Sequence, residues 1–494
     1  MFAVPLCDTE TAGATARPAA AAAPPRRAHL VGAAGSGMRS LAAVLAGWGW
    51  ELTGSDLAPG PVELGRHTRM TVCRGHAAAN VPGDADLVVY SDAIPVDNPE
   101  TGRAAELGIP ALSYFQVLGR LMAGRHGLAV AGTHGKSTTT AMAAEILVRA
   151  GLDPTVVFGA APLGRTGGGR AGRGELMLVE ACEYRANFLH LQPQTAVILG
   201  IEPDHFDCYR TAGELEEAFG RFARSVPREG LLLAQNGCAA TRRVPAGAAC
   251  RVETFGFKSG ADWQARGLAL RRGIYAFDVV RRGQVLCRVH LRVPGRHNVL
   301  NALAAAALAW VGGVPPERIG AALGGFRGLH RRLELVGAWR GVTLVDDYAH
   351  HPTEVTATLQ TLRRMFPGRR VWCVFQPHQV SRTERLLDEL AESLQNADRV
   401  LVAEIFRARE GPPRDGDVTA ADLARRVREV SAAPSGRPAG AAVEVPEVHA
   451  TEDITRLLET RLAPGDVLVT MGAGDIRRIC DGLIDRFRED RAAG

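Results

Sequence analysis

The sequence predicts an α/β protein with three domains. Along its 494 residues, short apolar segments repeatedly lead into glycine turns and then into Ala- and Leu-rich helical stretches, a pattern typical of parallel strands alternating with helices. A chain of this length, 46% hydrophobic and 22% charged, has room for several domains of ordinary size. Glycine-rich turns near His126 and Phe326 separate three groups of such units, so we expect domains at 28–126, 127–326 and 327–494.

The residues before the first domain, 1–27, are expected to form a disordered leader. They are rich in Ala and Pro without periodicity, so they cannot bury enough apolar surface to become ordered. The Arg- and Gly-rich stretches at 164–174 and 409–417 are expected to be surface loops, because neither has a face that could pack.

Composition and charge exclude several classes of protein. The formal net charge is only +5 and no dense Lys/Arg block occurs, which argues against a nucleic-acid-binding or polybasic membrane surface. The nine cysteines form no C-x-x-C pair, which argues against a disulfide framework or a zinc ribbon and favours a reducing compartment. No apolar run is long enough for a transmembrane segment. We therefore expect a cytoplasmic protein with small ligands.

The first domain opens with a strand and a glycine turn, HLVGAAGSGM, and an acid, Asp56, ends the next strand. This arrangement suits a diphosphate at a helix N-terminus with the acid near a ribose. The spacing G-x-x-G-x-G differs from the dinucleotide fingerprint, so tight packing of strand on helix is an equally good interpretation. The binding hypothesis assigns Gly35, Ser36, Gly37, Met38 and Asp56.

The second domain opens with AVAGTHGKSTTT, which reads as a strand, a glycine turn and a helix start. The turn supplies a run of backbone N–H groups, a mobile cation and a hydroxyl that can bind magnesium, so it predicts a triphosphate site. Val130 stands where the generic G-x-x-x-x-G-K-[ST] pattern has its first glycine, and the alternative is a turn followed by a surface lysine. The hypothesis assigns Gly132, Thr133, His134, Gly135, Lys136, Ser137 and Thr138.

Acidic stretches follow two later strands of this domain. LVEACEYRANF carries Glu180 and Glu183, and IEPDHFDCY carries Glu202, Asp204, His205 and Asp207. Groups at the carboxyl ends of parallel strands face the ligand crevice, where a carboxylate and an imidazole can hold Mg²⁺ that bridges phosphate oxygens. Taken singly, each acid is better explained as a solvated loop charge.

Together these segments resemble the Mur ligases, ATP-dependent amide-bond-forming enzymes of peptidoglycan synthesis. The resemblance runs from about Ala28 to about Phe487, with markers in family order and near family spacing: GSGM, GSD, AVAGTHGKSTTT, NFLHLQP, IEPDHFD, GRHNVLNALAA, DDYAHHPTEV, FQPHQVSRT and TMGAGDI. It implies a Rossmann-like N-terminal domain for a UDP-sugar, a central P-loop ATPase domain, and a Rossmann-like C-terminal domain that brings the amino acid.

Within the family, the sequence is most similar to the members that add L-alanine to UDP-N-acetylmuramic acid. The resemblance implies that the lactyl carboxylate attacks the γ-phosphate of ATP and that the amine of L-alanine then displaces phosphate from the acyl phosphate. The implied cofactors are ATP and Mg²⁺. UDP-N-acetylmuramic acid and L-alanine are the implied partners, and contact with other cell-wall synthesis enzymes is a further expectation.

The resemblance also assigns roles to single residues. It implies that Mg²⁺ is held by Ser137, Glu180 and a neutral His205, and that the nucleotide is also bound by His297, Asn298, Asn301 and Asp347. Asn side chains both donate and accept, as an adenine edge demands. The implied catalytic set is Lys136, His205, His350 and Arg382. His350 either steers the ammonium of the amino acid or takes its proton.

The sequence departs from the family pattern at two places. Many members have D-E-S-D where this chain has Cys182-Glu183-Tyr184-Arg185, which puts the number of metals in doubt. Gln379 stands where many relatives carry an arginine that could serve the amino-acid carboxylate. We expect weaker binding of the amino acid as a result, unless Arg185 reaches the same pocket.

Two other functions remain open from the sequence. One is a recycling ligase that attaches an intact peptide to the same sugar nucleotide, with which DDYAHHP is also compatible. The other is an inactive relative that binds the UDP-sugar and acts as a scaffold, although such a protein has no need of Lys136, Ser137, Glu180 and His205 together.

Overall fold

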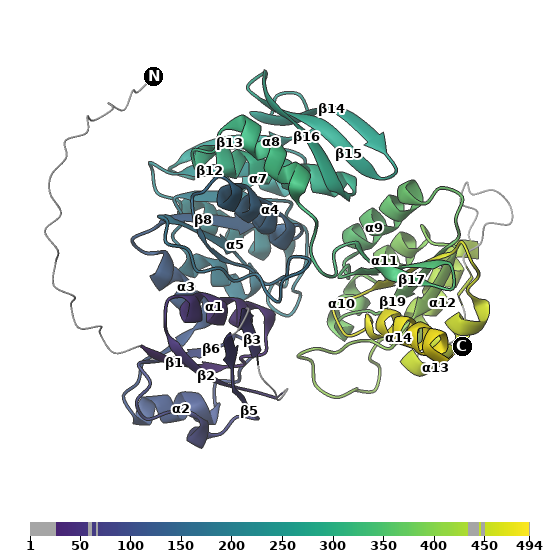
Figure 1. Cartoon of the computed structure of the whole chain (residues 1–494), viewed down its shortest axis with the longest axis horizontal. Helices are drawn as coiled ribbons and strands as arrows, with labels where there is room; N and C mark the ends of the chain where they lie inside the picture. The colour runs from purple at the N-terminus through teal and green to yellow at the C-terminus, as the bar shows by residue number, and fades with distance from the viewer. Residues whose placement is uncertain (1–25, 58–61, 66–67, 433–443, 446–449, 494) are drawn as a thin grey trace, which may run out of the picture.

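Three α/β units follow one another along the chain (Figure 1). The computed structural model describes residues 26–57, 62–65, 68–432, 444–445 and 450–493. Most of the predicted leader, 1–27, lies outside these residues, and the first strand begins at Arg27. Within the described ranges, no helix is both long and apolar enough to cross a membrane.

The first unit is a five-stranded parallel sheet with the order β5-β2-β1-β6-β7. Its strands are β1 (Arg27–Val31), β2 (Glu51–Asp56), β5 (Val72–Arg74), β6 (Leu87–Tyr90) and β7 (Ala111–Ser113). A separate hairpin pairs β3 (Val62–Gly65) with β4 (Thr68–Met70), and the helices are α1 (Ser36–Gly47), α2 (Pro99–Glu106), α3 (Tyr114–Met122) and the short 3₁₀ helix η1 (Ala78–Asn80). The carboxyl end of β1 leads directly into α1.

The central unit is a nine-stranded sheet with the order β16-β15-β14-β13-β12-β11-β8-β10-β9. Its parallel part comprises β8 (His126–Ala131), β9 (Thr155–Val157), β10 (Leu176–Glu180), β11 (Thr195–Ile198), β12 (Leu231–Gln235) and β13 (Arg251–Gly256). The helical segments are α4 (Lys136–Arg149), η2 (Tyr184–His190), α5 (Ala212–Arg224), α6 (Ala239–Arg243), α7 (Arg296–Val311) and α8 (Pro316–Gly325). The Ala-rich α7 is buried along almost its whole length and packs against α4.

The far edge of the central sheet is an antiparallel meander that the sequence analysis did not predict. It consists of β14 (Trp263–Arg271), β15 (Ile274–Arg281) and β16 (Gln284–Pro294). Each hairpin turns on an Arg-Gly pair with both residues at positive φ, the first at Arg272 and Gly273 (φ +47° and +77°). That backbone matches the twist of tight hairpins, so the chain folds straight back instead of crossing over through a helix.

The C-terminal unit is a five-stranded sheet with the order β17-β18-β21-β19-β20. Only the β17–β18 pair is antiparallel. Its strands are β17 (Glu334–Trp339), β18 (Val342–Asp347), β19 (Val371–Phe375), β20 (Arg399–Val402) and β21 (Val467–Met471). Its helices are α9 (Pro352–Met365), α10 (Val380–Arg385), α11 (Leu387–Leu394), α12 (Ala420–Ala432), α13 (Thr451–Arg461) and α14 (Arg478–Ala493).

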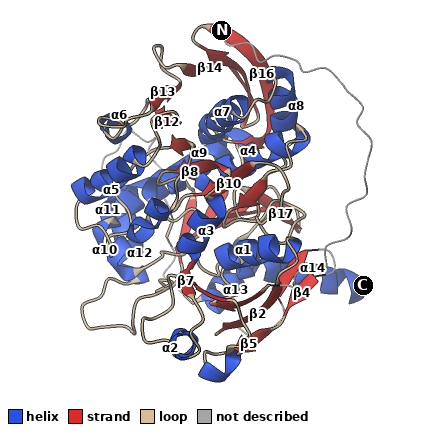
Figure 2. Ribbon diagram, turned by 90° about the vertical axis from the view of Figure 1, so that its left-hand side faces the viewer, coloured by secondary structure: helices blue, strands red, loops and turns tan. Residues whose placement is uncertain are grey.

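The two junctions between units differ in kind. The first and central units share one continuous apolar core cluster, and the Ser40 hydroxyl of α1 donates to the Phe158 carbonyl at 2.7 Å. The C-terminal unit has core clusters of its own and lies beside the central one in Figure 1, whereas the two overlap in the view of Figure 2. The contacts across this second junction are largely polar, and they surround the site described next.

Candidate active site

The phosphate-binding turn lies between β8 and α4 at the carboxyl edge of the central sheet. Gly132 and Gly135 both have positive φ, +136° and +80°. A Cβ on Gly135 would lie 2.4 Å from Asn301 Oδ1, and one on Gly132 would lie 2.6 Å from Leu199 Cβ. Glycine is therefore required at both positions for steric as well as conformational reasons. The turn ends at the N-terminus of α4, where free backbone N–H groups favour an anion.

Lys136, the first residue of α4, is nearly buried and held by three acceptors. Its Nζ donates to the Gly132 carbonyl at 2.6 Å, to the Thr133 carbonyl at 3.1 Å and to Glu183 Oε1 at 3.0 Å. Burial alone would lower the pKa of Lys136, but the Glu183 carboxylate raises it above its usual value. The lysine is therefore charged and fixed beside the turn.

The predicted metal ligands fall into two contacting groups. Glu180 ends β10, the neighbour of β8, and its Oε1 accepts the Ser137 hydroxyl at 2.8 Å. His205 Nε2 instead lies 3.3 Å from Glu183 Oε1, so Glu183 connects His205 to Lys136. Burial opposes ionisation of Glu183, but Lys136 and His205 hold the pKa of this carboxyl below its usual value. Glu183, which the sequence offers as a strand-end acid but the family resemblance does not assign as a ligand, thus connects the two predicted residues.

A cavity of about 250 Å³ begins at the phosphate turn and extends between the central and C-terminal units. Burial lowers the pKa of His297 to about 4, and its buried Nδ1 has no partner among the described residues. Asn301 Nδ2 donates to Asn298 Oδ1 at 3.0 Å, which orients the two amides together. The predicted nucleotide residues that line this cavity are His134, Gly135, Thr138, His297, Asn298, Asn301 and Asp347.

Asp347 closes the cavity from the C-terminal unit, at the end of β18. Its two carboxyl oxygens accept the backbone N–H groups of Leu333 at 2.6 Å and Ala349 at 2.7 Å. Burial nevertheless raises the pKa of Asp347 to about 7. Arg332, whose Cζ lies 4.8 Å from the centroid of the Tyr348 ring, also lines the cavity and brings a cation that the sequence analysis did not identify.

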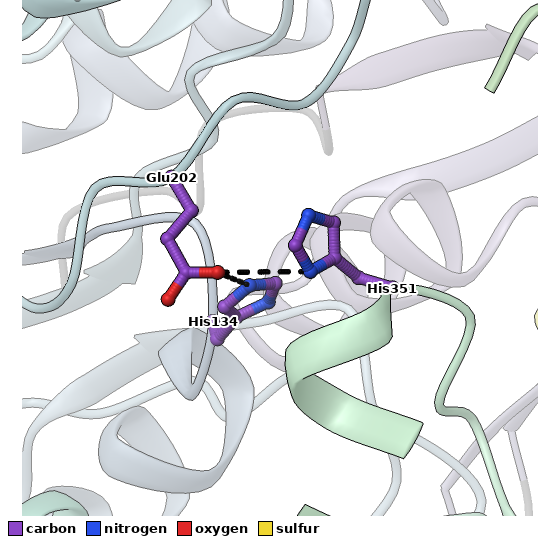
Figure 3. A group of neighbouring side chains, drawn as sticks. All are labelled: His134, Glu202 and His351. Carbon is purple, nitrogen blue, oxygen red and sulfur yellow. Dashed lines mark ion pairs between the residues drawn. The ribbon is translucent and has the colours of Figure 1, made fainter. Parts of the chain in front are cut away.

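A polar cluster joins the phosphate turn to the C-terminal unit (Figure 3). His134 Nδ1 lies 3.0 Å from Glu354 Oε1, and Glu202 Oε2 lies 3.5 Å from His134 Nε2 and 3.7 Å from His351 Nδ1. Although His134, Glu202 and His351 could surround a cation, His134 is better placed as an imidazolium. Burial alone would lower its pKa, but the Glu354 and Glu202 carboxylates raise the pKa of His134 to about 9, and a protonated ring has no lone pair for a metal.

A second polar group joins the two units at Arg382. Its Nε and Nη2 donate to Asp204 Oδ1 at 2.8 and 2.7 Å, and both side chains are buried. Burial alone would raise the pKa of Asp204, but Arg382 holds it well below its usual value. Arg382 Nη1 also contacts His378 Nδ1 at 2.9 Å. The Arg382 guanidinium therefore binds other side chains of the protein, and the sequence did not predict these contacts.

His350 lies beside this group with its ring close to His378, the ring centroids being 5.7 Å apart. Burial lowers the pKa of His350 to about 4, so the ring is neutral near pH 7. Its Nδ1 lies 2.9 Å from the Tyr348 carbonyl, which places the proton on Nδ1 and leaves the Nε2 lone pair free to accept one.

The predicted UDP-sugar residues lie at the junction of β1, α1 and β2. Gly35 caps α1 without a side-chain hydrogen bond, and the Ala34 N–H donates to Asp56 Oδ2 at 2.9 Å. Asp56 therefore fixes the turn itself. A Cβ added to Gly159 would lie 3.6 Å from Ser36 Oγ and 3.8 Å from Glu180 Oε2, which brings the first-domain turn next to the predicted metal ligand.

Family models match each of the three units. The "Mur ligase family, catalytic domain" matches 27–126, the "Mur ligase middle domain" matches 130–309, and the "Mur ligase, glutamate ligase domain" matches 331–474. Similar curated proteins include the UDP-N-acetylmuramate–L-alanine ligases of Clostridium novyi and Desulfitobacterium hafniense. They are 39% and 40% identical to this chain over 93% of its length, which covers 97% and 100% of those proteins.

Solved structures show the same architecture. The UDP-N-acetylmuramate-alanine ligase of Thermotoga maritima aligns with a TM-score of 0.75 at 26% identity, covering 94% of this chain and 99% of that one. A murein peptide ligase from Psychrobacter arcticus aligns with a TM-score of 0.68, also at 26% identity, covering 93% and 98%.

Proposed function

The chain belongs to the Mur ligase family, and from this membership and the site geometry we propose that it joins L-alanine to the lactyl carboxylate of UDP-N-acetylmuramic acid, converting ATP to ADP and phosphate. The relatives that support the substrates are alanine ligases matched over nearly their full length. The observation that carries the proposal is the cavity that runs from the phosphate turn to His297, Asn298 and Asn301 and is closed by Asp347 of the C-terminal unit. It lies where two domains meet, which is a common position for a nucleotide site.

The reaction has two steps. A lactyl carboxylate oxygen attacks the γ-phosphorus of ATP, the bond from that phosphorus to the bridging oxygen breaks, and ADP leaves. The amine of L-alanine then attacks the carbonyl carbon of the acyl phosphate, loses a proton and expels phosphate, which leaves an amide. Both steps develop negative charge on phosphate oxygens, so they require fixed cations and N–H donors near those oxygens.

Lys136 and the phosphate turn supply this stabilisation. The Lys136 ammonium is bound to Glu183 and two backbone carbonyls. It is pre-positioned at the start of α4, where the helix N-terminus adds its own N–H donors. In our proposal, phosphate oxygens replace part of these contacts, and Lys136 neutralises the transferring group.

The donor set next to the turn fits Mg²⁺. Ser137 and Glu180 already touch, and both offer oxygen, the ligand that Mg²⁺ prefers. His205, which contacts Glu183, stays a predicted ligand. When bound, Mg²⁺ supplies charge neutralisation on the phosphates. Glu180 and Ser137 orient the phosphate end of the site, and Glu183 keeps Lys136 and His205 in place.

His350 is suited to take the proton of the amine in the second step. It is neutral, and the contact from Nδ1 to the Tyr348 carbonyl leaves Nε2 as the basic nitrogen. A histidine that remained protonated could only repel the ammonium form of the amino acid. We therefore propose that His350 acts as a base and not as an anchor for the ammonium.

The recycling ligase remains the second candidate, because a murein peptide ligase aligns over most of the chain. The test is phosphate release by the purified enzyme with ATP, Mg²⁺ and UDP-N-acetylmuramic acid, with each amino acid and a tripeptide added in turn. Release with L-alanine is expected. If no amino acid causes phosphate release but the tripeptide does, the protein is a recycling ligase instead. Residence in the cytoplasm and contact with other cell-wall enzymes stay predictions.

A further inference from the structure

One guanidinium at the junction of the units forms no direct ion pair among the described residues, although its charge favours the ionised form of the nearby Asp92 carboxyl. Arg409 belongs to the loop that follows β20, and its Cζ lies 4.3 Å from the centroid of the Tyr184 ring in the central unit. In the part of the chain that the structure describes, no carboxylate oxygen lies within 4.0 Å of it. Its side chain is exposed. The group is therefore charged, accessible and available to an anion.

The loop that carries Arg409 is fastened to the segment around Gln379. The Gln379 N–H donates to the Phe406 carbonyl at 2.9 Å, and the Phe406 N–H donates to the Pro377 carbonyl at 2.9 Å. Glu410 accepts the N–H groups at the start of α10, from Val380 at 2.5 Å and Ser381 at 3.0 Å. Arg409 thus projects from a held backbone, beside the segment where relatives carry the arginine that this chain lacks.

Three other side chains that could bind an α-carboxylate either have a partner already or carry no charge. Arg382 forms a buried ion pair with Asp204. Gln379 offers a neutral amide, which binds a carboxylate more weakly than a guanidinium. Arg185 is also exposed, and its Cζ lies 5.4 Å from the centroid of the same Tyr184 ring, but its Nη1 already donates to the Asp92 carbonyl of the first unit at 3.4 Å.

Tyr184 links Arg409 to the catalytic groups. Its ring is buried and fixed by a hydrogen bond from its hydroxyl to Asp207 Oδ2 at 3.0 Å. The same ring lies 5.2 Å from the ring of His205, which in turn contacts Glu183 and so Lys136. A small molecule held at Arg409 is therefore at the edge of the reacting region and not on a remote surface.

We propose that Arg409 binds the α-carboxylate of the incoming amino acid, with the Tyr184 ring holding the guanidinium in place. This inference rests on the proposed function. It predicts a preference for a free amino acid, because the first residue of a peptide carries an amide where L-alanine carries its carboxylate. A guanidinium matched to a carboxylate discriminates against the neutral analogue, since the charge then lacks its partner.

The test compares L-alanine with L-alaninamide in Arg409→Ala and in a matched control, Arg414→Ala, which removes an exposed arginine from the same loop. The ratio of kcat/KM for L-alanine to that for L-alaninamide is expected to fall by about tenfold to a hundredfold in Arg409→Ala. The control should keep the wild-type ratio. Arg409→Lys, which keeps the charge without the planar fork, should lie between.

Each result separates two explanations. An equal loss with both amines in Arg409→Ala would overturn the proposal and make the residue a contact between units. Wild-type values of kcat/KM for both amines in Arg409→Ala would overturn it as well. If the L-alanine to L-alaninamide ratio falls in Arg185→Ala instead, the α-carboxylate is bound by Arg185. If the wild-type enzyme uses neither amine, the proposed function itself fails, and that result is visible before any variant is made.

Discussion

Lys136→Ala tests the phosphate turn and its buried ion pair together. The exposed fractions of the Lys136 and Glu183 side chains are 13% and 1%, so removal of the lysine leaves a buried carboxylate that, among the described residues, has only the His205 ring as a charge partner. Removal of one partner from such a pair destabilises a protein by about 3–5 kcal/mol, and the remaining imidazole places the expected loss near ~3 kcal/mol. Turnover should fall by at least about a thousandfold, or about 4 kcal/mol of transition-state stabilisation.

The two effects of this substitution can be measured separately. Thermal unfolding reports the loss of stability, phosphate release reports turnover, and calorimetry with UDP-N-acetylmuramic acid reports whether the first domain still binds its ligand, which we expect. The double variant Lys136→Ala, Glu183→Gln removes the unpaired charge. It should regain part of the stability but none of the turnover. Turnover of Lys136→Ala within about tenfold of the wild type would refute the assignment of this turn.

Three further predictions concern the metal site, pH and the sugar nucleotide. Glu180→Gln and His205→Ala should each raise the Mg²⁺ concentration for half-maximal phosphate release with little change in the unfolding midpoint, and unchanged magnesium curves would remove both residues from the site. Because the pKa of His134 is raised to about 9, protonation of this ring contributes up to ~3 kcal/mol to stability, a contribution that is complete below pH 6.5 and is lost as the pH rises through about 9. His134→Gln should therefore flatten this part of the plot of unfolding midpoint against pH. An unaltered plot would contradict the assignment of His134 as an imidazolium. Asp56→Ala, which frees the Ala34 N–H, should raise the KM for UDP-N-acetylmuramic acid and leave that for ATP unchanged, so parallel rises would point to general disorder of the protein.

The family and the α/β fold could be predicted from the sequence, and both are confirmed. Strands and turns are local, and a phosphate turn such as GTHGKS carries its geometry within a few residues. The meander β14–β16 could not be predicted in this way, because its turns are Arg-Gly pairs and not the Asn-Gly or Asp-Gly pairs that are typical of tight hairpins.

The pairings across the site could not be predicted. Arg382 and Asp204 lie 178 positions apart in the chain, and His134 and Glu354 lie 220 apart. Each residue alone looks like a ligand-binding group, and only the docking of two separately folded units shows that it binds another side chain. Arg409 was assigned to a surface loop for the same reason, since nothing local indicates that the loop reaches Tyr184.

Oxygen transfer from the lactyl carboxylate tests the central claim most directly. The enzyme is supplied with ATP, Mg²⁺, L-alanine and UDP-N-acetylmuramic acid that is labelled with ¹⁸O in both oxygens of that carboxylate. The released phosphate and the alanyl amide are then analysed by mass spectrometry. An acyl phosphate predicts that each released phosphate carries a single labelled oxygen and that the alanyl amide appears in equal amount. Unlabelled phosphate, or phosphate release that does not depend on L-alanine, would contradict the account.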